Sequence, residues 1–351
     1  MNILRVCRFA LYLAAATIGG LALAHASGAG YHLLKKYSFL PAGGSTREYF
    51  DYITVDSAAR RVYASHGTEV KVIDADNGTL IGNITGLKQD HGIALAPEFG
   101  RGFISDGAQA KVMIFDLKTL KIIGEAKADP DTDCVVYDPA SKRVFAMNGD
   151  SQTSTVINAK DGTVVKTIPL GGSPEFAVAD GHGTIFNNLE DKNEVVAIDT
   201  KTLEIKSRWP VSPAGGPTAL SIDAKNRRIF VAGRNPQMLA VLDADSGKVI
   251  QSFPISAGVD ASVFESGTGM VFVSTRQGMV HIFHEDSADK FSAVETLKTE
   301  YGAKTMGLDT KTHNLFLDTA DFGAPPAPTA ARPHPQPAAV LGTFRVLEYG
   351  R

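Results

Sequence analysis

Short runs in which apolar and polar residues alternate follow one another along most of the chain, separated by polar turns. In the first clear unit, the expected strands are 49–55, 61–65, 69–73 and 79–84. The turn before the last of them contains Asp76, Asn77 and Gly78, residue types that favour tight hairpins. Because side chains on a strand alternate between its two faces, this pattern predicts a four-stranded antiparallel unit.

This unit recurs seven times at a nearly constant period. An aromatic residue of the second strand marks each copy: Tyr63, Phe103, Phe145, Phe186, Phe230, Phe272 and Phe316. The steps between them are 40, 42, 41, 44, 42 and 44 residues, a spacing typical of propeller blades. The repeat predicts an all-β fold, a seven-bladed β-propeller of four-stranded antiparallel blades, with the aromatics packed between neighbouring blades.

The last copy departs from this pattern in two ways. Third strands end at His284 in the sixth copy and at Glu348 in the seventh, 64 residues later, and the excess falls in a Pro/Ala-rich stretch at 323–337. That composition cannot form a strand ladder, so we expect a loop inserted between the second and third strands. No fourth strand follows, whereas segment 30–40 resembles the fourth strands of other copies. We expect this N-terminal strand to complete the last blade and close the ring.

Residues 1–26 have the features of a secretory signal peptide. Arg5 and Arg8 precede an apolar run over 9–23, and Ala24-His25-Ala26 offers a cleavage site. The run has about 15 residues, fewer than the about 20 of a membrane-spanning helix. We therefore expect an exported protein, periplasmic or secreted, with no integral membrane segment after signal removal and one propeller domain over 27–351. Cys134 is then its single cysteine, which we expect to be a buried, inert thiol.

The repeat resembles that of a known family. The phrases RRVYAS…VKVIDADNGTLIGNI, KRVFAMN…TVINAKDGTVVKTIPLG and RRIFVAG…LAVLDADSGKVIQSFPI are similar to the YVTN-type repeat of the YncE-like exported bacterial propellers. The resemblance covers essentially the whole mature chain. It implies a seven-bladed shape and export, and it supplies no catalytic residues. The Asn of the repeat is kept only at Asn148.

Ligands of propellers usually bind where the loops that enter the inner strands surround the central channel. These entries lie twelve positions before each repeated aromatic, or eleven in the fourth copy. The residues found there are Asp51, His91, Asp133, Glu175, Thr218, Asp260 and Lys304. The loops between second and third strands, on the same face, add His66, Asp106, Asn148, Arg234 and Arg276.

Among these residues, most of the acidic side chains come from a different part of the chain than the lysine and arginine side chains. Carboxylates and imidazoles predominate in the first three copies, whereas Arg234, Arg276 and Lys304 belong to the last three. We expect eight of these residues to bind a ligand: Asp51, His91, Asp133, Glu175, Asp260, Lys304, Arg234 and Arg276. Four are candidate ligands for a divalent metal, because imidazole and carboxylate form such sets: His66, His91, Asp106 and Asp133. The alternative is that these polar side chains satisfy backbone groups at the strand ends.

Composition narrows the function further. The formal net charge is −3, with no basic cluster, so binding to nucleic acid through phosphates is not expected. No C-x-x-C-H or H-E-x-x-H motif is present. The sequence predicts a binding or scaffold protein, without assigned catalytic residues or cofactor, that holds a small molecule or protein partner at the channel mouth. The alternative is a metal-assisted hydrolase or lyase, lactonase-like, with its site at the same mouth.

Overall fold

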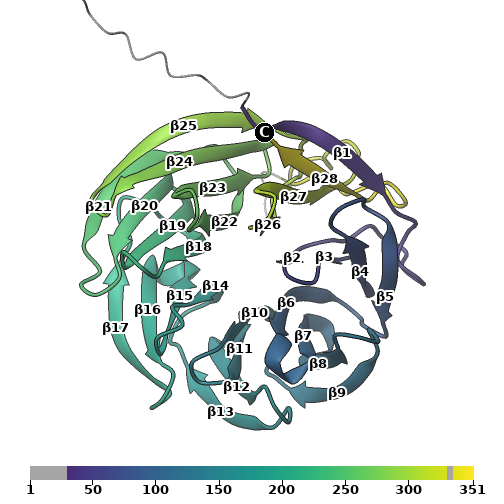
Figure 1. Cartoon of the computed structure of the whole chain (residues 1–351), viewed down its shortest axis with the longest axis horizontal. Helices are drawn as coiled ribbons and strands as arrows, with labels where there is room; N and C mark the ends of the chain where they lie inside the picture. Colours follow the sequence, from purple (N-terminus) through teal and green to yellow (C-terminus); the bar gives the residue numbers. More distant parts are fainter. Residues whose placement is uncertain (1–29, 330–334) are drawn as a thin grey trace, which may run out of the picture.

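The computed structural model describes residues 30–329 and 335–351. Seven four-stranded antiparallel sheets stand around a central channel, as the repeat predicts (Figure 1). The expected signal peptide at 1–26 lies outside the described residues. Within the described ranges, no helix has the length and apolarity needed to cross a membrane.

In blades one to six the strands run outward from the channel in chain order, and in blade seven the outermost strand is the N-terminal one. Blade one contains β2 (Ile53–Asp56), β3 (Arg61–Ser65), β4 (Glu69–Asp74) and β5 (Leu80–Thr85); blade two contains β6 (Asp90–Ala96), β7 (Arg101–Asp106), β8 (Lys111–Asp116) and β9 (Ile122–Lys127). Blade three contains β10 (Thr132–Asp138), β11 (Arg143–Asn148), β12 (Thr153–Asn158) and β13 (Val164–Pro169); blade four contains β14 (Pro174–Ala179), β15 (Thr184–Leu189), β16 (Glu194–Asp199) and β17 (Glu204–Pro210). Blade five contains β18 (Pro217–Asp223), β19 (Arg228–Arg234), β20 (Gln237–Asp243) and β21 (Val249–Pro254); blade six contains β22 (Val259–Glu265), β23 (Met270–Thr275), β24 (Met279–Ser287) and β25 (Lys290–Lys298). Blade seven contains β26 (Met306–Asp309), β27 (Asn314–Thr319), β28 (Arg345–Gly350) and β1 (His32–Ser38), and short 3-10 turns lie at η1 (Pro97–Phe99), η2 (Gly107–Gln109) and η3 (Glu190–Lys192).

The N-terminal strand closes the ring. β1 pairs antiparallel with β28, from His32 opposite Gly350 to Ser38 opposite Arg345. The Tyr37 hydroxyl also donates a hydrogen bond to Glu348 Oε2 at 2.6 Å. The predicted closure is therefore confirmed, and β28 keeps no open edge.

The repeated aromatics fill the contacts between blades. All seven are among the largest fully buried side chains of the protein. Phe103 of blade two, for example, packs in one cluster with Val144, Ala146 and Ile157 of blade three. Each buried aromatic contributes about 1.5–3 kcal/mol through its apolar area, so the repeat is a packing requirement.

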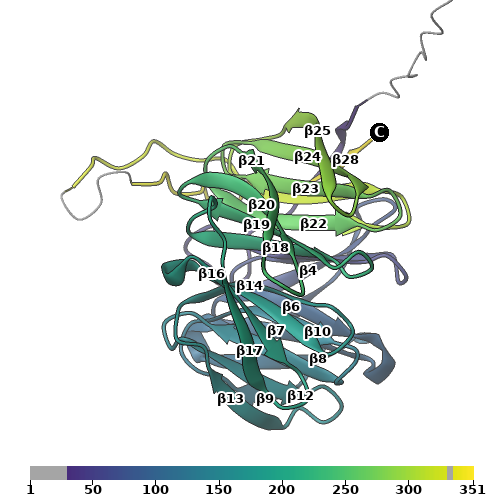
Figure 2. The ribbon, with the colours of Figure 1, turned by 90° about the vertical axis from the view of Figure 1, so that its left-hand side faces the viewer.

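The Pro/Ala-rich stretch belongs to the loop that joins β27 to β28. Gly323 N–H donates to the Ala338 carbonyl at 3.0 Å, which holds the two arms of the loop together. At its return to the ring, Gly342 N–H donates to Glu48 Oε2 at 2.6 Å. The loop projects from one face of the propeller, to the left in Figure 2.

The innermost strand of blade one is shorter than predicted. β2 begins at Ile53, not at Tyr49. The reason is that Asp51 replaces ladder bonds with side-chain bonds: its N–H donates to Ser65 Oγ at 2.9 Å, and its carbonyl accepts from the Thr305 hydroxyl. Residues 49–52 therefore form part of the loop around the channel mouth.

Candidate functional site

Irregular pairing at the start of the inner strands positions the site residues. The register between first and second strands shifts at 90–93, 132–135, 174–177, 217–219 and 259–261. These intervals contain His91, Asp133, Glu175, Thr218 and Asp260. Bulges bend a strand and re-aim its side chains, and they are frequent beside functional sites. In five blades, the same kind of bulge therefore positions a residue at the channel mouth.

Gly92 permits the blades to approach closely behind His91. A Cβ at this position would lie 2.7 Å from the Asp133 carbonyl oxygen and 2.7 Å from Val135 N. The same contact is completed by Ser105, whose hydroxyl accepts the Gly92 N–H at 2.8 Å and donates to the Asp133 carbonyl. These backbone contacts therefore fix the positions of His91 and Asp133 relative to each other.

His91 lies at the centre of one charged group. Its Nδ1 is 2.8 Å from Asp51 Oδ2 and 3.3 Å from Asp133 Oδ1, and the Tyr49 hydroxyl lies 2.9 Å from the same nitrogen. Burial disfavours the charged ring, but the bond to Asp51 and the charge of Asp133 outweigh it and raise the pKa of His91 to about 9. His91 is therefore a cation near neutral pH.

Lys304 joins this group to a second one. Its Nζ donates to Asp51 Oδ1 at 3.0 Å and also to Asp260 Oδ2. Burial opposes the charge of Lys304, yet the Asp260 and Asp51 carboxylates hold its pKa above the usual range. Burial likewise opposes the charge of Asp51, but Lys304 and His91 hold the pKa of that carboxyl well below its usual range. Lys304, Asp51 and His91 therefore remain charged together.

Arg234 completes the second group. Its guanidinium donates to Asp260 Oδ1 and, at 3.1 Å, to Glu190 Oε1 of η3. Burial opposes the charge, but Asp260, Glu175 and Glu190 raise the pKa of Arg234. The acids Asp51 and Asp260 thus each have direct cationic partners.

Two acids of the mouth lack that compensation. Burial, and then the charge of Asp51, raise the pKa of Asp133 to about 7. The buried Oδ1 of Asp133 makes no hydrogen bond with the described residues, because the single Nδ1 proton of His91 is directed to Asp51. Burial raises the pKa of Glu175 to about 9, with Arg234 opposing and Asp133 adding to the effect. Its carboxylate has no hydrogen bond or ion pair within 30–329 and 335–351.

These groups surround a small cavity with an aromatic floor. The cavity has a volume of about 180 Å³, and its lining consists of Tyr49, Asp51, Tyr52, His91, Asp133, Glu175, Phe176, Arg234, Asp260 and Lys304. Tyr52 of blade one and Phe176 of blade four stack on each other, with ring centroids 4.7 Å apart. The stack separates the polar mouth from the rest of the channel.

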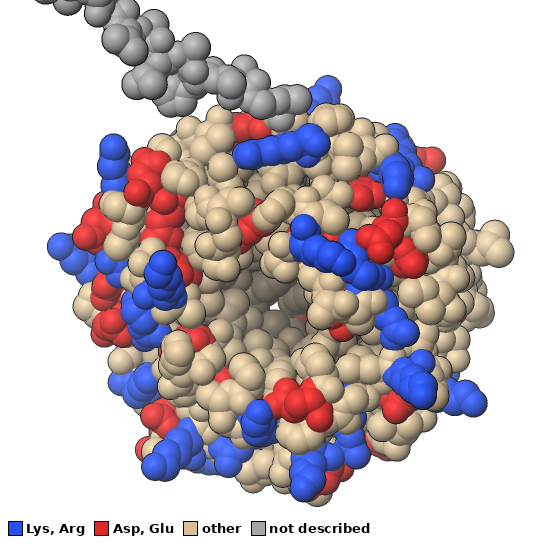
Figure 3. All heavy atoms as spheres, in the orientation of Figure 1, with Lys and Arg blue, Asp and Glu red and all other residues tan. Residues whose placement is uncertain are grey.

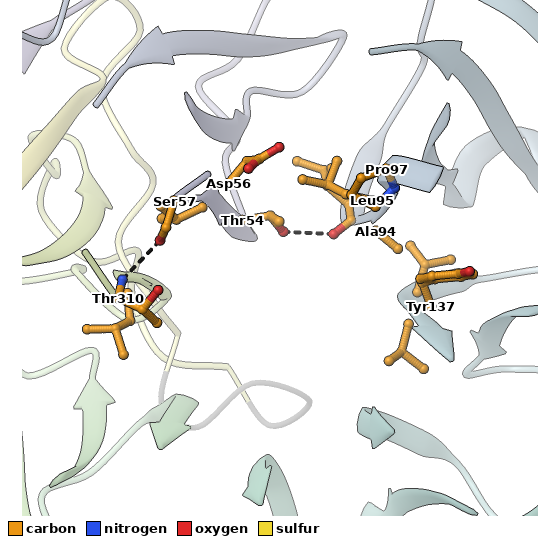
Figure 4. A pocket seen from close by; sticks show the side chains of 13 residues that line it. Thr54, Asp56, Ser57, Ala94, Leu95, Pro97, Tyr137 and Thr310 are labelled. Atoms are coloured by element: carbon orange, nitrogen blue, oxygen red, sulfur yellow. Dashed lines mark hydrogen bonds between the residues drawn. The ribbon is translucent and has the colours of Figure 1, made fainter. Parts of the chain in front are cut away.

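Beyond the stack, the channel is apolar. A cavity of about 420 Å³ lined by residues such as Val135, Leu220 and Val263 is followed by one of about 470 Å³ at the other end. There the polar side chains bond to the protein itself: Thr54 Oγ1 donates to the Ile93 carbonyl at 2.7 Å, and Ser57 Oγ accepts the Thr310 N–H at 2.9 Å (Figure 4). This end therefore offers few free polar groups to a ligand.

The opposite face of the ring carries mixed charge. In Figure 3, which views the propeller from the side away from the Pro/Ala-rich loop, Lys and Arg side chains alternate with Asp and Glu around the rim, and uncharged residues surround the central hollow. No continuous basic surface crosses this face.

The predicted site residues are not all brought together. Arg276 is half-buried beside the mouth and reaches Lys304 only through its charge. His66 is fully buried: its ring stacks on Phe344 with centroids 4.1 Å apart, and its Nε2 bonds to Glu48. Asp106 accepts the N–H groups of Lys88 and Gln89 at 2.8 and 3.2 Å. His66 and Asp106 thus stabilise loops, as in the alternative considered for polar residues at strand ends.

Two of the four predicted metal ligands, His91 and Asp133, lie together with Asp51. One ligand atom each from Asp51, His91 and Asp133 lies within 4.8 Å of the others. Imidazole with two carboxylates suits Zn²⁺ or a similar divalent ion. An ion here would compete with Lys304 for Asp51, and His91 would have to lose its Nδ1 proton. The donor set therefore fits a metal, which would replace the bonds that His91 and Lys304 make to Asp51.

Sequence reasoning missed the aromatic and outer members of the site. Tyr49, Tyr52 and Phe176 lie within two residues of positions that the repeat marks, so neighbours of each strand entry could have been included. Glu190 follows the second strand of blade four and could have been found the same way. Cys134 is buried, and burial raises the pKa of its thiol to about 12, as expected for an inert cysteine.

Comparisons with known proteins support the fold. No protein family and no curated protein matches the chain by sequence. Among solved structures, it is similar to a chain of one titled Kuenenia stuttgartiensis Hydrazine Synthase, with a TM-score of 0.68 and 13% sequence identity over 79% of this chain and 95% of that one. At this identity the likeness shows the β-propeller fold alone, and the chain is a seven-bladed β-propeller whose family the comparisons leave unassigned.

Proposed function

We propose that the protein is an exported binding protein that holds a small polar ligand, or a polar group of a partner, in the cavity at the channel mouth. The observation that carries the proposal is the lining of this cavity: seven of its ten residues are ionisable side chains from the Asp, Glu, His, Lys and Arg classes. Burying so many charges is costly unless they are paired or serve a ligand. Asp133 and Glu175 are not fully paired.

A binding role agrees with the rigidity of the mouth. The charged side chains there stand at the entry of an inner strand or, for Arg234, at the end of the second strand β19, and several are fixed by contacts between blades, such as Lys304 with Asp51. A preformed, partly enclosed cavity with convergent polar groups is the usual form of a small-molecule site. The Tyr49 hydroxyl lies 2.9 Å from His91 Nδ1, but His91 is protonated and cannot serve as its base, so binding is favoured over catalysis.

The test is a thermal-shift screen of the purified protein against small cations, anions and zwitterions, followed by calorimetry of the hits. We expect hits to bind the wild type and Asp150→Asn, which changes an exposed carboxylate on the same face. Glu175→Phe should fill the cavity and abolish binding while the protein stays folded by circular dichroism. Hits that bind this variant unchanged would place the ligand site elsewhere.

Export and family membership are separate parts of the proposal. The signal-like segment 1–26 and the YVTN-type repeats support an exported protein of the YncE-like family. Expression in a Gram-negative host followed by mass measurement of the periplasmic fraction tests export. We expect a mature chain that starts at Ser27, and an uncleaved cytoplasmic product would contradict this part alone.

The second candidate function is metal-assisted hydrolysis or lyase chemistry. It is favoured by the ligand atoms of Asp51, His91 and Asp133, which lie within 4.8 Å of one another. A divalent ion there would supply a Lewis acid, while Arg234 would hold an anionic substrate. Because Lys304 competes for Asp51, we expect Lys304→Met to bind Zn²⁺ more tightly and His91→Gln to lose it. If neither the wild type nor Lys304→Met bound one zinc ion per protein, this candidate would be eliminated.

A further inference from the structure

The acids at the channel mouth are unequally neutralised. Asp51 is bonded by Lys304 and His91, and Asp260 is bonded by Lys304 and Arg234. No lysine or arginine side chain reaches Asp133 or Glu175 within hydrogen-bonding distance in the part of the chain that the structure describes. The cavity thus contains two neighbouring carboxyl groups that the protein leaves without a full counter-charge.

Charge counting shows what would complete the cavity. Its lining contains four carboxyl groups, and three cations: His91, Lys304 and Arg234. When all are ionised, one negative charge is left over, and it belongs to the Asp133 and Glu175 side. A ligand with one positive charge would balance the site, whereas an anion would need a cation already used by Asp51 or Asp260.

The cavity also offers an apolar surface. Tyr52 and Phe176, both half-buried, stack on each other and line the same cavity as these two carboxyl groups. Glu175 and Phe176 are adjacent in the chain, so the acid stands at the edge of the aromatic surface. A cavity of about 180 Å³ admits a small molecule of roughly ten non-hydrogen atoms and not a peptide or a nucleotide.

We infer that the cavity binds a small organic ammonium ion, whose positive group lies between the carboxylates of Asp133 and Glu175 and whose apolar part lies on the Tyr52 and Phe176 rings. The inference rests on the proposed function and names its ligand class. An ammonium group has three N–H donors and suits two carboxylates from different blades.

Three probes of the same shape test the inference by calorimetry: benzylammonium, benzyl alcohol and benzoate. We expect one benzylammonium per protein, with the neutral and anionic probes at least tenfold weaker. Asp133→Asn and Glu175→Gln should each weaken benzylammonium at least tenfold, and the matched control Asp150→Asn should leave it unchanged.

Each other outcome has a defined meaning. Tighter binding of benzoate that is lost in Arg234→Leu would overturn the ammonium inference and leave a polar ligand at the mouth. Benzylammonium binding that survives both acid variants, or that EDTA abolishes, would also overturn it, because the cation would lie elsewhere or on a metal. No binding of any probe refutes the ligand class, and the broader screen then decides the proposed function independently.

Discussion

Tyr52 of blade one and Phe176 of blade four meet across the channel, with ring centroids 4.7 Å apart and 29° between their planes. These blades stand as far apart around a seven-membered ring as two blades can. The pair therefore links opposite sides of the propeller by direct contact. It also separates a mouth lined by charged side chains from a channel lined by apolar ones.

Removing one ring of this pair should open the mouth into the channel. Phe176→Ala is expected to cost about 1–2 kcal/mol in the free energy of unfolding, less than the about 3–5 kcal/mol of a fully buried phenylalanine, because the ring is half-buried. Urea denaturation measures this loss. Tyr52→Phe retains both rings and serves as the control. An equal loss in Tyr52→Phe would attribute the stability to the hydroxyl group and not to the stack.

Glu175→Gln should make the protein more stable at alkaline pH. Since the pKa of Glu175 is about 9 in the folded protein and near 4.3 when exposed, the folded state binds more protons between these values. Stability of the wild type therefore falls as the pH rises through this window. The glutamine variant avoids this loss and should gain more than about 1 kcal/mol at pH 9, the worth of one pKa unit.

The comparison is made by urea denaturation at pH 5 and pH 9. At pH 5 the carboxyl group is protonated in the folded protein, so wild type and variant should differ little. Asp150→Asn, in an exposed loop, should follow the wild type at both values. A variant that loses stability at pH 9 would show that Glu175 is held as a carboxylate by its surroundings.

His91 should act in the same direction as Glu175. Its pKa is raised to about 9, so its bond to Asp51 adds stability that is fully present below the unfolded value of about 6.5 and is lost as the pH rises through 9. Glu175→Gln should therefore flatten the pH dependence without removing it. The residual slope between pH 8 and 9, above the pKa of about 7 of Asp133, is read from the same denaturation curves and should disappear when His91→Gln is added. A slope unchanged by both substitutions would assign it to groups outside the mouth.

The fixed period of the repeat predicts both the fold and most of the residues that line the mouth. Phe103 and its equivalents recur because every pair of blades must bury an aromatic at the same place, and a fixed period then locates the strand entries. Asp51, His91, Asp133, Glu175, Asp260 and Lys304 were found by that count and line one cavity.

The contacts among these residues could not be predicted from the period. Lys304 belongs to the last blade and Asp51 to the first, so the division of charge along the sequence suggested opposite sides. Closure of the ring makes these blades neighbours, and the two side chains form an ion pair at 3.0 Å. His66 illustrates the converse, because Phe344, which covers its ring, comes from the other end of the chain.

Lys304→Met should destabilise the protein at neutral pH by about 3–5 kcal/mol, the usual cost of removing one partner of a buried ion pair. Asp51 and Asp260 would then face each other without their shared cation. Protonation relieves this repulsion, so the difference from wild type should shrink as the pH falls from 7 to 4. Lys311→Met, at an exposed turn, is the control for loss of charge. A difference that does not depend on pH would indicate lost packing and not lost compensation.

Removal of the closing strand should convert a closed ring into one with an open edge. β28 pairs with β27 on one side and with β1 on the other, so a chain that begins at Phe39 would expose the N–H and C=O groups of Arg345–Gly350. Unpaired edges associate with other edges, so we expect dimers or larger species by light scattering and a lower melting temperature. A chain that begins at Gly30 retains β1 and should match the full-length mature protein.

Within β1, Tyr37→Phe removes only the bond to Glu348 and should cost about 1 kcal/mol while the protein keeps its oligomeric state. If the chain without β1 kept both its oligomeric state and its melting temperature, the strand would be an attachment to the ring and not its closure.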